Sequence, residues 1–425
     1  MGAARTPEGE ASGSEGDGGG RHGDRDGDLA GPGVGGEVGA VTDATPAGGR
    51  GAQLARTGLR SGWTTGACAT AASTAAYTAL LTGGFPDPVR ITLPKGRTPA
   101  FALAVEDLAP DGSTATVGVV KDAGDDPDVT HGALVRSTVR RLPPGSGVRF
   151  VAGPGVGTVT RPGLPLEVGE PAINPVPRRL MREHLTEVAV VHDDGAPDRE
   201  PDVEVTISVD HGEEIARSTW NPRLGILGGL SILGTTGVVV PYSCSAWIDS
   251  IRRGVDVALA AGRTHLAACT GSTSERTVLA EYGVPEDALL DMGDFAGAVL
   301  KYVRRHPAPR LTICGGFAKL SKLAVGHLDL HSARSAVDKG FLAELARRGG
   351  AGDDLVAAVA GANTGLDALQ RCRAAGVPLG DLVAVEARDQ ALAVLRGAPV
   401  AVDVVCVDRA GTVVGRSPVR GPAPT

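Results

Sequence analysis

The feature that most constrains the fold is a regular alternation of short apolar runs and helix-like segments in the second half of the chain. The runs VVV, HLAAC, LLDM and LTIC lie within residues 237–241, 265–269, 288–292 and 310–314. Each is followed by a turn of small or polar residues and then by a helix-like segment, such as residues 246–261. Strands that are covered on both faces have short apolar runs of this kind. The pattern predicts a parallel, doubly wound sheet, and residues 400–416 are expected to form a terminal hairpin.

The first half of the ordered chain predicts a mixed arrangement of strands and helices. Residues 64–82 are expected to form a helix of small residues, capped by Thr64 or Thr65 and ended by Gly83. Two strands are expected at residues 89–93 and 101–108, around a turn at 94–99. The other elements expected here are strands at 115–120, 148–151, 157–160 and 204–209 and a short helix at 177–185.

The N-terminal segment has a different composition from the rest. Residues 1–50 contain 16 Gly, nine acidic and four basic residues, and very few large apolar ones. Such a segment buries too little apolar surface to offset its loss of chain entropy. We therefore expect a disordered tail over residues 1–55, a mixed α/β domain on the substrate side over 56–230, and a Rossmann-like, doubly wound domain with a C-terminal hairpin over 231–425. The predicted fold class is two-domain α/β.

Charge and composition exclude several classes of protein. Most of the net charge of −7 comes from the tail, since the remaining chain has 38 basic and 40 acidic residues. A broad basic face for nucleic acid is therefore not expected. Neither a spanning apolar stretch nor the apolar core of a secretion signal is present, so we expect a cytoplasmic protein without a membrane segment. The six Cys residues form no CxxC pair, which favours free thiols. A homo-oligomer is compatible with the sequence but not required by it.

Small polar loops follow the predicted strands of the second half. They are CTGSTSE at 269–275, MGDF at 292–295 and CGGFAK at 314–319. Ligands of parallel sheets bind at the carboxyl ends of the strands, where Gly allows close approach and helix N-termini offer free N–H groups. Asp291 or Asp294 could accept hydrogen bonds from a ribose. The sequence has neither a GxGxxG nor a P-loop motif, and the same glycines would also suit ordinary tight turns.

The most unusual local feature of the first half is the acidic stretch KDAGDDPDVTHG at residues 121–132. It contains four Asp residues and His131. Acid–base chemistry, a metal site and binding of a cationic or hydroxylated group all suit this composition. A solvated, Asp-rich turn around Pro127 is the structural alternative.

Three further patterns admit both a functional and a structural interpretation. Residues 219–237 are too Gly-rich for a helix and too apolar for an exposed loop, which indicates buried backbone at a ligand wall or an irregular linker. His327, Asp329 and His331 could bind a metal weakly or cap the next helix. Lys319, Lys322 and Arg334 could recognise carboxylates or form a solvated face.

Several long motifs resemble the cobalt-precorrin-5B (C-1)-methyltransferase family of anaerobic cobalamin biosynthesis. They are GWTTGACATAA (62–72), KDAGDDPDVTHG (121–132), GPGVGTVTRPGL (153–164), GEPAINPVPR (169–178), TWNPRLGILGGLSILGTTGVVVP (219–241) and CGGFAKLSKLAVGHLDLHS (314–332). The resemblance covers about residues 57–345 in order. Cys314-Gly315-Gly316 departs slightly from the expected small-residue turn, and the tail has no counterpart in the family.

The resemblance implies methyl transfer from S-adenosylmethionine, as co-substrate, to ring carbon C-1 of cobalt-precorrin-5B, giving cobalt-precorrin-6A. The cobalt arrives with the substrate, so no metal site of the protein's own is expected. The macrocycle is expected to lie in a cleft between the two domains. The residues assigned on this basis are Asp126 and His131 as catalytic; Lys121, Asp122, Asp125, Asn174 and Arg223 as substrate-binding; and Thr270, Gly271, Ser272, Gly293 and Asp294 as cofactor-binding.

Two other classes of function remain open from the residues alone. A nicotinamide-dependent reductase would fit the alternating second half, although the missing GxGxxG counts against it. A non-catalytic tetrapyrrole carrier would bind the macrocycle without turnover. Binding of NADPH rather than S-adenosylmethionine would favour the reductase, and macrocycle binding without methyl transfer would favour the carrier.

Overall fold

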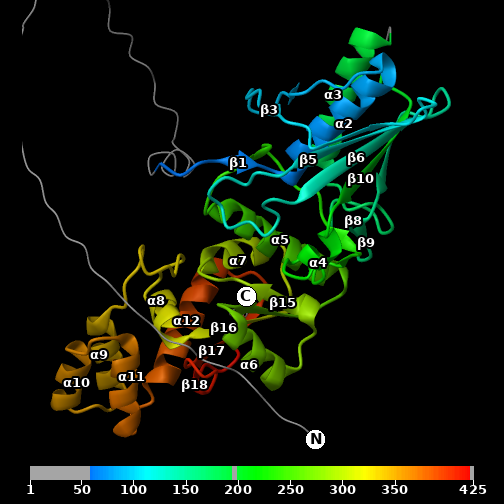
Figure 1. The fold of residues 1–425 in the computed structure, drawn as a ribbon. Coiled ribbons are helices and arrows are strands. Elements are labelled where there is room, and N and C mark those ends of the chain that lie inside the picture. Colours follow the sequence, from blue (N-terminus) through cyan, green and yellow to red (C-terminus); the bar gives the residue numbers. More distant parts are fainter. Residues whose placement is uncertain (1–57, 194–198, 422–425) are drawn as a thin grey trace, which may run out of the picture. The chain divides into compact units, whose positions relative to one another are not determined.

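The computed structural model describes residues 58–193 and 199–421, which form a mixed α/β structure with two five-stranded sheets (Figure 1). Each sheet has its own large apolar core. The predicted tail at residues 1–55 lies outside the described residues. The domain boundaries at 56–230 and 231–425 remain a prediction. Within the described ranges, no helix is both long and apolar enough to cross a membrane.

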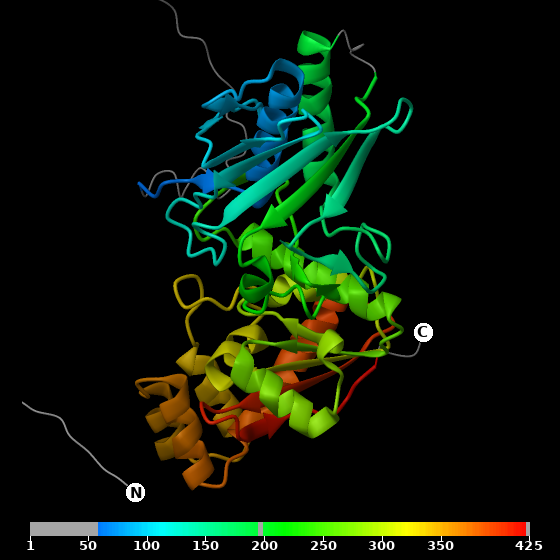
Figure 2. The same ribbon diagram turned by 45° about the vertical axis from the view of Figure 1, so that its right-hand side comes forward.

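The first sheet has the strand order β4-β5-β6-β10-β7. Its strands are β4 (Val105–Leu108), β5 (Thr114–Val120), β6 (Leu134–Arg141), β7 (Val148–Ala152) and β10 (Val203–Val209). All neighbours are antiparallel except β10 and β7. Helices α2 (Thr65–Thr82) and α3 (Pro175–His192) pack against each other, and α2 also packs on β5 and β6, as both ribbon views show (Figures 1 and 2).

Helix α2 confirms the predicted helix and its caps. The Thr64 hydroxyl accepts from the Ala67 amide at 3.2 Å, and Gly83 ends the helix in the left-handed region. Most residues of α2 are small and buried, and their small side chains let the helix lie close to the sheet. The Ser73 hydroxyl bonds that of Ser137 at 2.9 Å in this core, so the buried polar pair is satisfied.

Several predicted elements of the first half differ from the structure. Strands at 89–93 and 101–108 are reduced to β2 (Val89–Arg90) and β3 (Ala100–Phe101), which pair with each other, while β4 joins the main sheet. The short helix expected at 177–185 is the 18-residue α3. The central strand β6 was not predicted at all. Its buried Val135, Ser137 and Val139 alternate with more exposed positions, but the polar Ser137 hides the period of two.

The second sheet has the order β15-β14-β16-β17-β18. The first four strands are parallel: β14 (His265–Cys269), β15 (Leu289–Asp291), β16 (Arg310–Gly316) and β17 (Ala401–Val407). Strand β18 (Val413–Arg416) is antiparallel to β17, which confirms the predicted hairpin. The four parallel strands are therefore in the order second, first, third, fourth, and the antiparallel fifth strand lies beyond the fourth.

One strand that the sequence predicts for this sheet does not belong to it. The run at residues 237–241 contributes only β13 (Val238–Val239), which pairs antiparallel with β1 (Gly62–Trp63). The fourth parallel strand is instead β17, whose side chains are buried at all but the first position. A strand buried on both faces needs the longer apolar run AVDVVCV, and that run lies far along the chain.

Helices fill the rest of the second half. They are α5 (Cys244–Ala260), α6 (Ser272–Tyr282), α7 (Ala296–Val303), α8 (Phe317–Ala324), α9 (Lys339–Arg348), α10 (Asp353–Ala360), α11 (Gly365–Ala374) and α12 (Leu379–Leu395). Helices α9, α10 and α11 pack on one another, and α12 packs on α8 and β17.

Residues 219–237 confirm the expectation of closely approached backbone. Strand β11 (Ile226–Leu227) pairs with β9 (Thr158–Val159), and β12 (Gly229–Leu230) pairs with β8 (Gly155–Val156). A Cβ atom on Gly229 would lie 2.3 Å from the backbone of Gly155. Only glycine fits this crossing without moving the main chain.

This crossing makes Gly229→Ala a test of the packing. The added methyl group meets rigid backbone, so we expect the free energy of unfolding to fall by about 1–3 kcal/mol. Gly84→Ala is the matched control, since no heavy atom lies within 4 Å of its Cβ position. Urea unfolding followed by circular dichroism measures both variants. Equal stability of the two variants would contradict the packing described here.

Candidate functional site

The carboxyl edge of the second sheet brings three loops together. Because β14, β15 and β16 are parallel, their ends lie side by side, and Cys269 is paired with both Asp291 and Cys314. The loop after β14 leads into α6 and the loop after β15 into α7, while β16 runs directly into α8. The Met292 and Gly293 amides donate to the Cys269 carbonyl at 2.8 and 3.3 Å. The predicted cofactor residues therefore lie on adjacent loops of one edge.

Lys319 of α8 connects these loops. Its Nζ donates to the Thr270 carbonyl at 3.2 Å and lies 3.1 Å from Oδ1 of Asp294. The second contact is an ion pair whose angle does not suit a hydrogen bond. One ammonium group thus fixes the loop after β14 against the loop after β15. The alternative of a solvated face does not apply to Lys319.

Gly271 shapes the turn between β14 and α6. Its φ of 152° and ψ of 178° belong to a region that is essentially restricted to glycine. No heavy atom lies within 4 Å of the position that a Cβ would take, so this side of the backbone is open. Ser272 begins α6, and no side chain caps that helix start. The turn therefore combines an accessible main chain with uncapped N–H groups.

Arg223 reaches this edge from the first half of the chain. Its guanidinium donates to both carboxylate oxygens of Glu275 in the first turn of α6, at 2.8 and 2.9 Å. The same guanidinium lies 4.8 Å from the ring centre of Trp220. In this structure Arg223 is occupied by an internal partner, and its predicted contact with the substrate stays a prediction. Sequence analysis did not single out Glu275 as that partner, because the two residues are 52 positions apart.

Asp291 is the most perturbed carboxyl group of the edge. Burial, and next the negative charge of Glu275, raise the pKa of Asp291 to about 6, although Arg223, Lys319 and the Gly293 amide oppose the shift. Its Oδ1 is buried and has no hydrogen-bond partner among the described residues. The Trp247 indole donates to its carbonyl at 2.9 Å, which fixes the main chain there.

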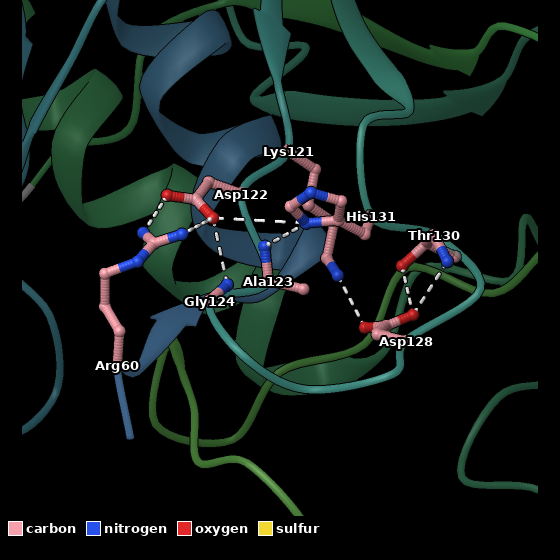
Figure 3. Close-up of polar contacts among 8 residues, drawn as sticks. All are labelled: Arg60, Lys121, Asp122, Ala123, Gly124, Asp128, Thr130 and His131. Atoms are coloured by element: carbon pink, nitrogen blue, oxygen red, sulfur yellow. Dashed lines mark hydrogen bonds and ion pairs between the residues drawn. The ribbon is translucent and has the colours of Figure 1, made fainter. Parts of the chain in front are cut away.

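The acidic loop at 121–132 is held by ion pairs at both ends, as Figure 3 shows. The side chain of Lys121 is 1% exposed and contacts Asp128 at 2.5 Å. Asp122 forms a bidentate pair with Arg60 and accepts from the Gly124 amide at 2.9 Å. The hydrogen bond from Arg60 is the main reason why the pKa of Asp122 falls to about 2. Lys121 and Asp122 thus support the loop, and their predicted contacts with substrate remain a prediction.

The two catalytic candidates of this loop differ in exposure, since His131 is exposed and Asp126 is half-buried. Nδ1 of His131 accepts from the Ala123 amide at 3.1 Å, so the neutral ring carries its proton on Nε2. The side chain of His131 is 53% exposed. Oδ1 of Asp126 accepts from the Tyr242 amide at 2.8 Å, and Oδ2 of Asp125 accepts from the Arg60 amide at 2.6 Å. Arg60 escaped the sequence analysis, because no local pattern links it to residues more than 60 positions away.

The remaining predicted positions are separate from these two groups. Asn174 precedes α3 and its amide donates to the Ile232 carbonyl at 3.4 Å. No hydrogen bond or ion pair within the described ranges joins residues 121–132 to the carboxyl edge of the second sheet. The structure therefore places the predicted substrate residues of the loop and the predicted cofactor residues in two groups, with Arg223 at the second group and Asn174 at neither.

The His327 to His331 stretch has internal partners. The side chain of His331 accepts from the Ala333 amide at 3.2 Å, and Asp329 pairs with Arg334 at 3.0 Å. Lys322 donates to the Leu330 carbonyl at 2.8 Å, and burial lowers its pKa. In the part of the chain that the structure describes, no group of three or more His, Cys, Asp or Glu side chains is arranged to hold a metal ion.

The raised pKa of Asp291 predicts a pH-dependent cost to stability. Between about pH 4 and pH 6 the folded protein keeps the Asp291 proton that the unfolded chain has lost, so stability falls as pH rises through this window. Asp291→Asn removes that loss. We expect it to raise the free energy of unfolding by about 1 kcal/mol near neutral pH, after allowing for partial solvent exposure.

Chemical denaturation of both proteins at several pH values measures this difference. It is expected to shrink as the pH falls from 6 to 4 and to vanish below about pH 3, where Asp291 is protonated in both states. Asp249→Asn on α5 is the matched control, since Asp249 is exposed and its ion pair with Arg253 is long, at 3.7 Å. A pH-independent difference for Asp291→Asn would show that its carboxyl group is not the cause.

Comparison with known proteins gives one family. The chain matches the CbiD family over residues 52–241 and the CbiD C-terminal domain over residues 329–418. The cobalt-precorrin-5B C(1)-methyltransferase of Brucella anthropi is 59% identical over 337 residues, which cover 79% of this chain and 90% of that protein. The protein of the same name from Paramagnetospirillum magneticum is 60% identical over 79% of this chain and 92% of that protein.

A solved structure is also similar in part. The crystal structure of the cobalamin biosynthesis protein (cbiD) from Archaeoglobus fulgidus covers 75% of this chain and 85% of that chain, with 23% identity and a TM-score of 0.34. This structural likeness is too low to carry an argument. The close relatives share most of their length with this sequence, and on that ground the chain belongs to the CbiD family.

Proposed function

We propose that this protein methylates ring carbon C-1 of cobalt-precorrin-5B with S-adenosylmethionine, giving cobalt-precorrin-6A. The observation that carries the proposal is the identity of about 59% to proteins named for this reaction, over nearly their whole length. The protein acts as a C-methyltransferase of cobalamin biosynthesis. Its cobalt belongs to the substrate.

The carboxyl edge of the second sheet has the charge that suits a cationic methyl donor. Glu275 and Asp294 are paired with Arg223 and Lys319, whereas Asp291 forms no ion pair in the described part of the chain, so one carboxylate is left for the cationic donor. S-adenosylmethionine supplies an activated methyl group on a positively charged sulfur. The open backbone at Gly271 and the uncapped start of α6 can receive its carboxylate. This placement includes Thr270, Ser272 and Gly293, and it treats residues 231–425 as a Rossmann-like domain.

Methyl transfer needs little chemistry from the protein. The bond between methyl carbon and sulfur breaks with its electron pair remaining on sulfur, and a π electron pair of the ring forms the new carbon–carbon bond. Residues that hold the two reactants in line therefore supply most of the rate enhancement. In this proposal the loop at 121–132 holds the macrocycle, together with Asn174 and Arg223.

The hydrogen bonds of the loop support different roles for its two catalytic candidates. His131 has its proton on Nε2, so it donates a hydrogen bond, and a carboxylate of the macrocycle is a suitable acceptor. Among the described residues, Asp126 accepts one hydrogen bond, from the Tyr242 amide, and it is the better acceptor for a proton released by the ring. His131 therefore orients the substrate, while Asp126 receives the proton.

Anaerobic turnover tests the reaction. With cobalt-precorrin-5B and S-adenosylmethionine, we expect a product that is one methyl group heavier and an equal amount of S-adenosylhomocysteine, both measured by mass spectrometry. Omission of either substrate is the control. Substrate binding without any S-adenosylhomocysteine would contradict the proposal and favour the carrier, whereas consumption of NADPH would favour the reductase.

The two loop residues give a second test. We expect Asp126→Asn to lower kcat by about tenfold or more, because a neutral amide cannot take up the proton. We expect His131→Ala mainly to raise KM by about tenfold, because one hydrogen bond to a charged group is lost. Steady-state kinetics, with Asp249→Asn as control, measures both. Unchanged kcat and KM in folded variants would exclude a role of this loop in the reaction.

A further inference from the structure

The three carboxyl groups at the carboxyl edge of the second sheet differ in their partners. Glu275 receives two hydrogen bonds from Arg223, and Asp294 is paired with Lys319. Asp291 forms no ion pair in the described part of the chain, and its Oδ1 has no hydrogen-bond donor there. Oδ1 of Asp294 also lacks a hydrogen-bond donor there, but it faces the Lys319 ammonium, so Asp291 is the one of the three carboxyl groups that has no cationic partner in the described part of the chain.

This lack of a partner opposes folding. Burial and the neighbouring charge of Glu275 both disfavour the charged form of Asp291, as its raised pKa reflects. A buried acceptor without a donor adds a desolvation cost that no contact within the protein repays. Arrangements that cost stability in this way are concentrated at ligand sites, where the ligand supplies the missing partner.

The position of Asp291 indicates which ligand group that is. It is the last residue of β15, and it lies 20 positions after Gly271, which turns the chain out of the neighbouring strand β14. In doubly wound sheets, an acidic residue at this distance from the first Gly-containing turn accepts hydrogen bonds from ribose hydroxyl groups.

Asp291 can be reached by a ligand, because it is partly exposed at the end of β15. The pocket that it lines with Trp220, Arg223 and Leu224 has a volume of about 20 Å³, which admits a water molecule and not a ribose, so the ribose would lie outside that pocket. Rotation about the last torsion of the side chain exchanges the buried and the outer oxygen. The adjacent Gly271 leaves open space on its own side of the turn.

We propose that Asp291 is the residue that binds the ribose hydroxyl groups of the methyl donor, and thereby selects a ribonucleoside. This inference rests on the proposed function, since it presupposes that S-adenosylmethionine binds at this edge. It predicts that one substitution both stabilises the protein and weakens donor binding. A purely structural residue would not combine these effects.

Isothermal titration of the full chain tests this proposal with S-adenosylhomocysteine and its counterparts that lack the 2′- or the 3′-hydroxyl group. We expect wild type to bind at least one deoxy counterpart about tenfold more weakly than S-adenosylhomocysteine, which is the loss of one hydrogen bond to a charged acceptor. The Asp291→Ala variant is expected to bind S-adenosylhomocysteine only as tightly as wild type binds that deoxy counterpart, so that the discrimination disappears. Asp291→Asn keeps a neutral acceptor, so its affinity for S-adenosylhomocysteine is expected to lie between those of wild type and Asp291→Ala.

The controls separate failure of this inference from failure of the proposed function. Asp249→Asn is expected to keep both the affinity and the discrimination of wild type. If wild type binds S-adenosylhomocysteine but does not discriminate against either deoxy counterpart, or if Asp291→Ala still discriminates, Asp291 does not bind the ribose. If wild type binds no S-adenosylhomocysteine at all, the proposed donor site itself is wrong.

Discussion

The parallel pairing of β14 with β15 and β16 is the constraint on which the candidate site depends. It places Cys269 beside Asp291 on one strand and Cys314 on the other, so that three loops emerge at one edge. A single ammonium group, that of Lys319, then fixes the loop after β14 to the loop after β15. Without parallel strands, residues 270, 294 and 319 would have no reason to meet.

The two polar groups of the molecule are built in different ways. In the loop at 121–132, the charges of Lys121 and Asp122 are neutralised by Asp128 and Arg60, which orders an otherwise repulsive acidic stretch. At the carboxyl edge of the second sheet, Glu275 is neutralised but Asp291 is not. A carboxylate that already has a cationic partner within the protein helps to hold the structure, whereas a carboxylate without one is available to a ligand.

Much of the fold was predictable wherever a pattern of side chains was local. The small residues of α2 with their cap at Thr64, the hairpin β17–β18 and the backbone crossing at Gly229 all follow from short stretches of sequence. Strand β6 was missed because Ser137 is a polar residue at a buried position, and the sequence does not show that Ser73 is its hydrogen-bond partner there. The run at 237–241 was placed in the wrong sheet because an apolar run does not specify its pairing partner.

The sequence by itself determined the family, through long motifs in the expected order, and it determined which loops follow the parallel strands. It also supplied the candidate residues of those loops, because glycine and small polar residues after a parallel strand let a ligand approach the backbone. Only the tertiary structure decided which charges are already paired. Arg223 pairs with Glu275 and Arg60 pairs with Asp122, although each pair is more than 50 residues apart in the sequence. Such distant pairs leave no local pattern. For the same reason, only folding shows that the Oδ1 atom of Asp291 has no partner.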